Sequence, residues 1–422
     1  MSSEHGDSLH NIIASPPQSP LNILEGIRVA DFSWVIAGPW LTKILAYFGA
    51  EVIRIESQTR PDAIRYYTDP EHGLQLDWTA RFSEFNAGKY GVSLDLRRPE
   101  AQDVAKRLVG ISDIVVENFS LYGMQKFGLT YETLREVNPA LIMLSRQAMG
   151  RCGPHKTYVT FGPNLLSLTG FVELCGEPNR EPSGMGLVLP DYSNGILGAF
   201  LILAALDYRR RTGVGQYLDM SQFEVLATLM QPAILDYSAN QRVATRQGNR
   251  HSVYAPHNCY PCLGEERYCV IVVKNETEWQ RLCQALGSPN WTQQPEFATF
   301  LRRRRNRDAL DRHLSEWSRQ HRAEDIMQRL QAHGVRAGVV QHIGDLTETD
   351  PHMQTRSFFA TVAHSVLGDV PISGLPWQLS RTPGAYTRGG PCLGEHNDYV
   401  YGDLLGMSQA DIASYTAQGI FH

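Results

Sequence analysis

The sequence predicts an α/β fold, in which a large domain with a Rossmann-like open parallel sheet is joined to a smaller α+β domain. Two observations carry this prediction. From residue 24 onward, short apolar runs alternate with helical patterns, which is typical of parallel βαβ units with right-handed crossovers. Around residue 258 the pattern changes to two extended runs joined by a turn with glycine, which indicates a β-hairpin.

The first half of the chain contains most of the predicted parallel strands. IRVADFS (27–33) is a buried strand bounded by glycine and proline, and a helix in WLTKILAYFGA follows it. EVIRIES (51–57) is the next strand, and GVSLDL precedes a helix from Pro99, whose fixed φ suits a first helical turn. Two more strands are expected at 113–120 and 140–149, with a helix in TYETLREVN between them.

The second half of the chain begins with a long apolar helix. It runs from LVLPDYSNGILGAF into DYRRRTG, where Gly213 is a natural stop, and another helix is expected at 221–235. NCYPCLGEERYCVIVV forms the predicted hairpin, helices follow at about 279–333, and GVRAGVV is extended. The predicted parts are a mobile N-terminal extension (1–23), the large domain (24–231), the small domain (232–350) and a C-terminal segment (351–422) that returns to the large domain.

Composition restricts the classes of function. The formal net charge of −5 and the pI near 6.3 argue against nucleic acid or an anionic membrane as a partner. The longest apolar run, 195–206, is shorter than the roughly 20 residues that span a bilayer. The first twenty residues lack a secretory signal, and seven cysteines do not make a disulfide framework in a chain of 422 residues, so we expect a cytoplasmic protein.

Several common catalytic motifs are absent from the sequence. There is no GxGxxG after the first strand, no GxxxxGK[ST] and no GxSxG, which argues against a standard dinucleotide site, a P-loop and an α/β-hydrolase elbow. Cys259 and Cys262 form a CxxC without a second pair, so no metal site is expected. The basic run LRRRRNRDALDRHL is interpreted as the solvated face of a helix.

Asp191 is the candidate catalytic residue. An aspartate at the start of a helix can simply cap the backbone N–H groups there. The same position lies beside amide donors and a partial positive potential, which could stabilise an oxyanion if the carboxylate attacked a carbonyl group. The local sequence leaves both interpretations open.

Four stretches, in this order and spacing, resemble the class III CoA-transferases. They are GIRVADFSWVIAGPWLTKILAYFGAEVIRIE, DIVVENFSLYGMQKFGL, PDYSNGILGAFLILAALDYRRRTGVGQYLDMSQFE and PCLGEHN. This family includes formyl-CoA, carnitine and benzylsuccinate CoA-transferases and, as a side branch, α-methylacyl-CoA racemases. The resemblance covers the chain from about Leu24 to its end, and it implies that Asp191 is a nucleophile that forms an aspartyl anhydride and then an aspartyl-CoA thioester.

The resemblance also implies where coenzyme A binds. A CoA thioester would be a substrate, and no tightly bound cofactor is expected. Because water would hydrolyse either covalent intermediate, we expect an apolar, closed pocket. Arg54 is a weaker candidate for phosphate contact. The implied CoA-binding residues are the loop Val35, Ile36 and Ala37, then Leu94, Arg97, Asn118, Phe119 and Lys126, and finally Met149, which together with Ile36 is expected to make the acyl pocket apolar.

Three questions stay open at this level. A racemase would need a histidine base where this chain has Phe161, and His155 lies six residues out of register, so transferase is favoured over racemase. The donor is expected to be succinyl-CoA, and the carboxylic acid acceptor could be benzylsuccinate, another dicarboxylate or a carnitine-like acid. By resemblance the subunits form an interlocked dimer, either a homodimer or a heterodimer with a homologous chain, which could also include a non-catalytic subunit.

Overall fold

The computed structural model describes residues 22–422, so all but the last two residues of the predicted extension (1–23) lie outside the described part. The described chain forms two compact units. The first unit comprises 22–169, Gly186–Leu235 and Gln354–His422, and the second comprises Gly170–Met185 and Asp236–Met353. The predicted small domain, 232–350, overlaps the second unit, which also includes the short segment Gly170–Met185.

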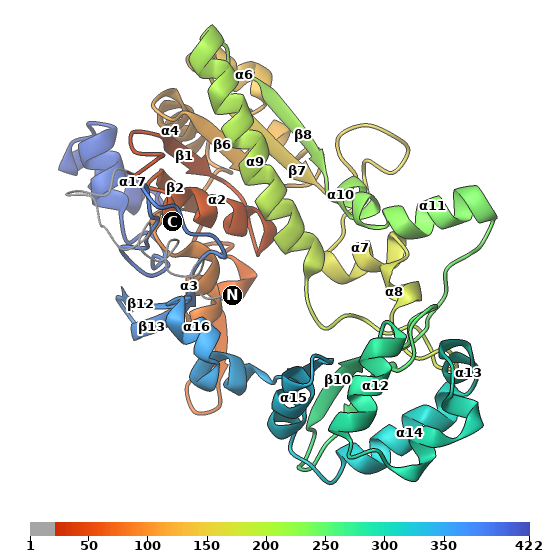
Figure 1. The fold of residues 1–422 in the computed structure, drawn as a ribbon. Helices are drawn as coiled ribbons and strands as arrows, with labels where there is room; N and C mark the ends of the chain where they lie inside the picture. The colour runs from red at the N-terminus through yellow and green to blue at the C-terminus, as the bar shows by residue number, and fades with distance from the viewer. Residues whose placement is uncertain (1–21) are drawn as a thin grey trace. The chain divides into compact units, whose positions relative to one another are not determined.

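A six-stranded sheet forms the centre of the first unit, and all its strands are parallel, as predicted (Figure 1). Its spatial order is β5-β2-β1-β6-β7-β8. The order reverses between β1 and β6, and open parallel sheets bind their ligands at the carboxyl ends of the strands next to such a reversal. The strands are β1 (Arg28–Asp31), β2 (Glu51–Glu56), β5 (Tyr90–Ser93), β6 (Ile114–Glu117), β7 (Ile142–Gln147) and β8 (Tyr217–Ser221).

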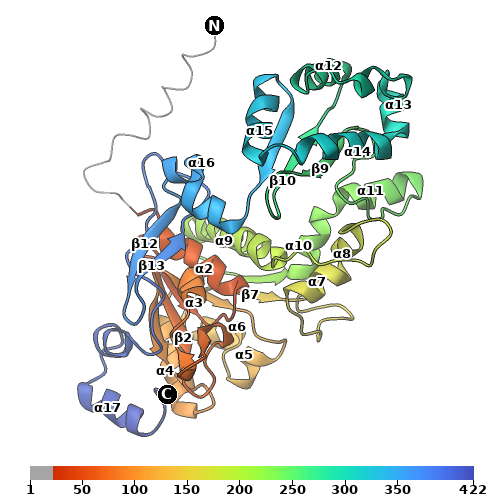
Figure 2. The same ribbon diagram turned by 90° about the horizontal axis from the view of Figure 1, so that it is seen from below.

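Helices cover both faces of this sheet because its strands are apolar on both sides. On one face, α2 (Ala37–Tyr47) and α9 (Leu189–Thr212) share a core with alternate residues of β1, β2, β6 and β7. On the other face, α4 (Pro99–Gly110) and α6 (Tyr131–Val137) pack against the remaining residues. The C-terminal segment joins this second core, where α17 (Gln409–Ala417) lies beside the α4 side of the sheet (Figure 2) and Tyr401 stacks on Phe421 at 3.8 Å.

Two glycines allow α9 to approach α2 closely. A Cβ atom on Gly195 would lie 2.3 Å from Cδ1 of Trp40, and one on Gly198 would lie 2.2 Å from Cδ1 of Leu41. No real side chain tolerates such distances, so these two positions fix the packing of α9 on the sheet. This packing also fixes the first turn of α9, which carries Asp191.

The apolar run predicted at 195–206 is only part of α9. The helix has 24 residues, and by length and composition it is the one helix in the part of the chain described that could cross a membrane. Burial explains only part of its apolar character: a stripe of mostly small residues from Pro190 to Ala205 is buried against α2 and the sheet, whereas larger apolar side chains such as Phe200 are exposed. Its last turn carries Arg209, Arg210 and Arg211 and ends at Gly213, as predicted.

Shorter elements complete the first unit. Two antiparallel hairpins lie outside the main sheet, and α3 contacts one strand of the second hairpin. These elements are β3 (Tyr66–Asp69) with β4 (Gly73–Leu76), β12 (Phe359–His364) with β13 (Gly368–Ser373), α3 (Ala80–Asn86), α5 (Gly123–Lys126), α7 (Gly162–Leu168) and α10 (Gln222–Leu229). The single helix predicted at 221–235 is two helices, α10 and α11 (Gln231–Asn240), and the division between the units falls within α11 and within α16 (Pro351–Thr355).

The second unit is an α+β structure. Its three-stranded sheet, in the order β11-β10-β9, is antiparallel, and it contains the hairpin expected from NCYPCLGEERYCVIVV. The strands are β9 (His257–Pro261), β10 (Tyr268–Val272) and β11 (Arg336–Val340). The helices are α8 (Phe171–Leu174), α12 (Glu276–Ala285), α13 (Phe300–Arg305), α14 (Arg307–Ser318) and α15 (Ala323–Ala332).

Candidate active site

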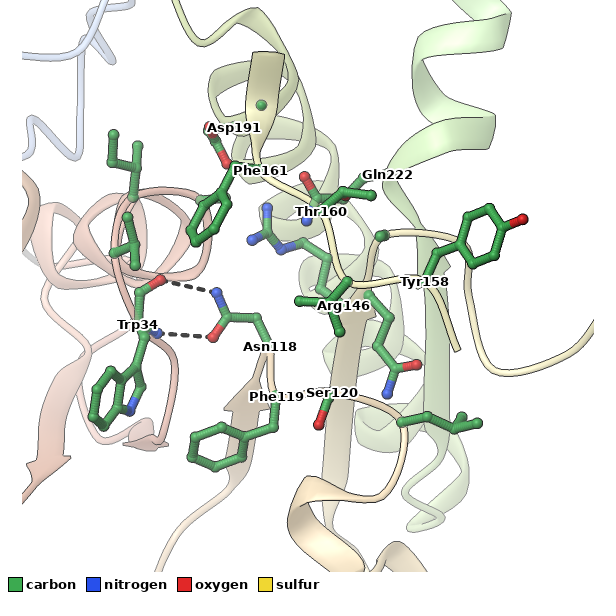
Figure 3. Close-up of a pocket in the computed structure, with 18 of the residues that line it drawn as sticks. Trp34, Asn118, Phe119, Ser120, Arg146, Tyr158, Thr160, Phe161, Asp191 and Gln222 are labelled. Carbon is green, nitrogen blue, oxygen red and sulfur yellow. Dashed lines mark hydrogen bonds between the residues drawn. The ribbon is translucent and has the colours of Figure 1, made fainter. Parts of the chain in front are cut away.

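A cavity of about 430 Å³ lies in the first unit at the carboxyl ends of β1, β6 and β7, where the strand order reverses. We call it the Asp191 cavity. Residues from the loops after β1, β2 and β6, from the end of β7 and the loop after it, from the segment at the start of α7 and from the starts of α9 and α10 line it (Figure 3). The site therefore combines parts of the chain that are more than one hundred residues apart in sequence.

Asp191 enters this cavity from the first turn of α9, but it does not cap the helix. The N-cap residue is Val188, and Asp191 is the third residue of the helix and makes no side-chain capping bond. The expected capping role is therefore wrong. Its backbone N–H donates to the carbonyl oxygen of Val188 (2.9 Å). Its carboxylate is not used for capping and lines the cavity.

The surroundings of the Asp191 carboxylate keep it close to the cavity wall and partly out of water. A Cβ atom on Gly162 would lie 3.0 Å from Oδ2 of Asp191, so a larger residue there would press on the carboxylate. Burial raises the pKa of Asp191, and the charge of Arg146 opposes this rise. A carboxylate that is partly desolvated is a more reactive nucleophile than one in water.

The loop after β1 is held in place from two sides. The backbone N–H of Trp34 donates to Oδ1 of Asn118 (2.8 Å), and Nδ2 of Asn118 donates to the carbonyl oxygen of Trp34 (2.9 Å; Figure 3). The next residue, Val35, has φ of 65°, a strained conformation for a β-branched side chain, and its N–H donates to Asp62 (2.7 Å). Val35, Ile36, Ala37 and Asn118 all line the cavity, and Asn118 also positions the loop.

Arg54 does not reach any ligand site, which corrects the interpretation of this residue as a candidate for phosphate contact. It is fully buried and forms ion pairs with Glu56 (3.0 Å) and Asp62 (2.6 Å). Because Asp62 also holds Val35, this buried network supports the loop beside Asp191. The role of Arg54 is therefore structural.

Arg146 and Glu117 are buried beside the site, and neither was predicted from the sequence. Burial raises the pKa of Glu117 to about 7, and hydrogen bonds from the Ser145 hydroxyl and from the N–H of Phe119 (2.7 Å) oppose this rise. Burial lowers the pKa of Arg146 to about 10, against the charges of Asp191 and Glu117. The signal in the sequence was an arginine inside the otherwise apolar run ALIMLSRQAM.

A second cavity, also of about 430 Å³, continues from the first along the ends of β2, β5 and β6. We call it the Leu94 cavity. Trp34, Arg60, Phe119 and Ser120 line both cavities, so the two are contiguous. The predicted residues Leu94, Arg97, Phe119 and Lys126 all line the Leu94 cavity.

The cations of the Leu94 cavity differ in their environment. The side chain of Arg97 is 66% exposed and pairs with Asp95 (2.7 Å). Arg60 lies over the ring of Trp34, at 5.6 Å from its centroid, where the two cavities meet. Arg60 had not been predicted, because nothing in its local sequence marks it.

One expectation about the acyl pocket is wrong, and a second is met only in part. Met149 is not among the described residues that line either cavity, because β7 ends at Gln147 and the chain turns away at Gly150, which has φ of 76°. Arg146, Gln147 and Ala148 line the Asp191 cavity instead. Polar groups of Arg146 and Gln147 therefore share the cavity with apolar side chains such as Ile36, so the cavity is mixed in character rather than purely apolar.

The fold and the site together define a class of protein. A Rossmann-like sheet carries two contiguous cavities at its switch point; cations line both of them, and one contains the partly desolvated carboxylate of Asp191. This arrangement suits an enzyme that binds a long, phosphate-bearing substrate and uses a carboxylate at its reactive end.

Comparisons with known proteins identify the family. The model of CoA-transferase family III matches residues 24–397, and the chain belongs to this family. It is 32% identical over 404 residues to a succinyl-CoA–D-citramalate CoA-transferase of Chloroflexus aurantiacus, covering 96% of this chain and 99% of that protein. It is 30% identical to a succinate–glutarate CoA-transferase of Agrobacterium fabrum, covering 90% and 95% of the two chains.

A solved structure supports the same conclusion. The crystal structure of a CaiB/BaiF family protein from Brucella suis is 30% identical and superposes with a TM-score of 0.83, covering 91% of this chain and 99% of that one. The fold, the family model and the relatives agree that this protein is an enzyme of the CoA-transferase type.

Proposed function

We propose that this enzyme transfers CoA from succinyl-CoA to a dicarboxylic acid through covalent intermediates on Asp191. The observation that carries the proposal is the half-buried Asp191 carboxylate in a cavity that is contiguous with a second cavity bearing cations. The names of the two relatives support the choice of donor and acceptor, because both include a succinyl or succinate group and a second dicarboxylic acid. Benzylsuccinate, one of the acceptors that the sequence left open, is a member of this class.

The proposed reaction balances without an external proton or electron donor. The Asp191 carboxylate attacks the thioester carbonyl carbon of the donor, the C–S bond breaks, and CoA thiolate leaves an acyl-aspartyl anhydride. The thiolate then attacks the aspartyl carbonyl carbon and expels the donor acid as its carboxylate. The acceptor carboxylate attacks the resulting aspartyl thioester, and the same two steps in reverse give the new acyl-CoA and free Asp191.

The two cavities supply the positions that these steps need. The Leu94 cavity, with Arg60, Arg97 and Lys126 along it, would hold the phosphate-bearing part of CoA. The thioester end would then lie in the Asp191 cavity beside the loop of Val35 and Ile36. Because Asn118 and Asp62 fix this loop, the reacting carbon would be held near Asp191 at little entropic cost.

The alternative of a two-base racemase has less support. Phe161 lines the Asp191 cavity where that chemistry would need a proton-transferring side chain, and phenylalanine cannot transfer a proton. Among the described residues that line this cavity there is no histidine. His155 lies outside the lining and packs on Tyr158, with ring centroids 4.6 Å apart.

We also propose a cytoplasmic dimer, as the resemblance implies. In support, α9 exposes the apolar side chains of Ile196, Phe200 and Leu203, which line an apolar groove together with Trp377 and Leu379. A surface of this kind is typical of subunit interfaces. All seven cysteines are free thiols, as in a reducing compartment. Light scattering of the purified chain alone, and again after expression with homologous chains, would separate a monomer from a homodimer and a heterodimer.

The test of the proposed function is direct detection of the covalent intermediate. The enzyme is incubated with succinyl-CoA, quenched with hydroxylamine, and the peptide that contains Asp191 is analysed by mass spectrometry. We expect a hydroxamate mass shift on Asp191 and, by chromatography, new acyl-CoA products with glutarate, D-citramalate or benzylsuccinate as acceptors.

Two variants make this test specific. Asp191→Asn should show neither the mass shift nor product. Asp207→Asn is the matched control, because Asp207 lies on the same helix but pairs with Arg210 (3.1 Å) and Arg211 (2.9 Å) at the surface. Product formation by Asp191→Asn at the normal rate would overturn the mechanism.

A further inference from the structure

Arg146 is the feature of the Asp191 cavity that the proposed reaction does not use. Its side chain is 1% exposed, and no described residue accepts a hydrogen bond from its Nε, Nη1 or Nη2. A guanidinium has five N–H donors, and its burial without acceptors is strongly unfavourable. A ligand that supplied a pair of acceptor oxygens would satisfy these donors.

The backbone of β7 directs Arg146 toward the nucleophile. Side chains alternate along a strand, and Ile142 and Leu144 pack into the core that α2 and α9 share. Arg146 continues this series and therefore lies on the α9 side of the sheet. Figure 3 shows its guanidinium extending into the cavity on the side of Asp191.

The charges around Arg146 leave it without a contact partner. Asp191 and Glu117 act on it through space, but neither forms an ion pair with it among the contacts of residues 22–422. The other charged side chains that line the cavity, Arg60 and Lys156, are also cations. A carboxylate that entered the cavity would therefore meet a positive region with an unused arginine at its centre.

The proposed reaction makes this imbalance larger. When Asp191 becomes an anhydride or a thioester it loses its negative charge, and the buried cation loses one of the two carboxylates that act on it. A substrate with a second, unreacted carboxylate would restore the balance. A monocarboxylic acid would not, because its only carboxylate is consumed at Asp191.

We propose that Arg146 binds the remote carboxylate of the dicarboxylic substrate while the other carboxyl group reacts at Asp191. This inference rests on the proposed function and names the residue that determines its substrate class. Arg146 and Asp191 both line the Asp191 cavity and form no direct ion pair among the described contacts, so the carbon chain of the proposed substrate would lie between them. The planar guanidinium fork matches a carboxylate in two parallel hydrogen bonds, which a lysine cannot reproduce.

The test compares glutarate with valerate, which has the same number of carbon atoms and a single carboxylate. The variants are Arg146→Met, Arg146→Lys and, as a matched control, Arg209→Met. Arg209 is a partly buried arginine that pairs with Asp113 (2.8 Å) at the other end of α9. For each protein, kcat/KM is measured for both acceptors with succinyl-CoA as donor, and the binding of both acids is measured by calorimetry.

We expect Arg146→Met to lower kcat/KM for glutarate by at least about 30-fold and to change the value for valerate by no more than about 3-fold. Arg146→Lys should show an intermediate loss, because it keeps the charge without the fork. It also serves as the second variant if Arg146→Met does not fold. Arg209→Met should keep the preference of the wild type for glutarate.

Other results would overturn the inference. Equal losses for glutarate and valerate would mean that Arg146 acts on the reacting groups, and an unchanged preference would mean that it does not bind the remote carboxylate. Calorimetry separates the two proposals. One result would overturn only the proposed function: glutarate binds to the wild type and not to the Arg146 variants, but none of the proteins converts it to glutaryl-CoA. The Arg146 site would then stand. If the wild type neither binds nor turns over glutarate, both fail.

Discussion

The substitution Glu117→Gln tests how strongly the core beside the active site depends on pH. Glu117 is fully buried at the end of β6, and its carboxylate accepts hydrogen bonds from the Ser145 hydroxyl and from the N–H of Phe119. Glutamine can keep both contacts, because its oxygen can accept from Phe119 while its NH₂ group donates to the Ser145 oxygen. The change therefore removes the charge and leaves the shape.

The magnitude follows from the pKa of Glu117, which rises from an ordinary 4.5 to about 7 in the folded protein. A rise of about 2.5 pH units corresponds to roughly 3 kcal/mol of folding free energy. Because the folded-state pKa is the higher one, this contribution is fully present below pH 4.5 and is lost as the pH rises through about 7. We therefore expect Glu117→Gln to gain stability over the wild type, by up to roughly 3 kcal/mol, as the pH is raised from 5 to 8.

Urea unfolding at several pH values between 5 and 8 would measure this difference. The control is Glu132→Gln on the surface of α6, which removes an exposed carboxylate and should give curves parallel to the wild type. A constant difference between Glu117→Gln and the wild type from pH 5 to 8 would refute the reasoning. It would mean that Glu117 does not take up a proton on folding in this range.

Three further predictions concern the position of the nucleophile. Asn118→Ala removes both hydrogen bonds to the backbone of Trp34, so we expect the free energy of unfolding in urea to fall by about 1–3 kcal/mol and the KM for the acyl-CoA donor to rise. An unchanged KM would contradict the role of this loop in positioning the donor. Gly195→Ala places a methyl group 2.3 Å from Trp40, so it should destabilise by about 1–3 kcal/mol although alanine favours helices, and a gain in thermal stability would show that α9 can shift. Burial raises the pKa of Asp191 above 3.8, and only the ionised carboxylate attacks the thioester. We therefore expect kcat/KM to fall at acid pH with a midpoint above 3.8. A kcat/KM that stays constant down to about pH 4 in folded enzyme would contradict this prediction.

The strands, the helices and the candidate nucleophile could be predicted from the sequence because each depends on local patterns. The alternation of β-branched runs with helical segments predicted all the strands of the parallel sheet except β8, and their bounds agree to within a few residues. Strand β8 was missed because YLDMS is short and follows the end of α9 closely. The same local reasoning placed Asp191 at a helix start, and the structure moves it from the cap to the first turn.

The surroundings of Asp191 could not be predicted in this way. Whether Met149 or Arg146 faces the cavity depends on where β7 ends and on which side of the sheet each side chain lies. Arg54 has the sequence of an ordinary strand residue, and only packing shows that it is buried against Glu56 and Asp62. Burial of a charge depends on the elements that cover it, which are far away in sequence.

The sequence by itself determined the α/β class, the family resemblance and the choice of Asp191, because these are carried by hydrophobic periodicity and by contiguous motifs. Only the tertiary structure decided that the strand order reverses beside Asp191, that Asn118 holds the loop of Trp34, and that Arg146 lies buried without a partner. The physical reason is that the desolvation of Asp191 and Arg146 arises when β7, α9 and their neighbours pack together. Local sequence specifies each element, and their packing specifies the electrostatic environment in which the carboxylate acts.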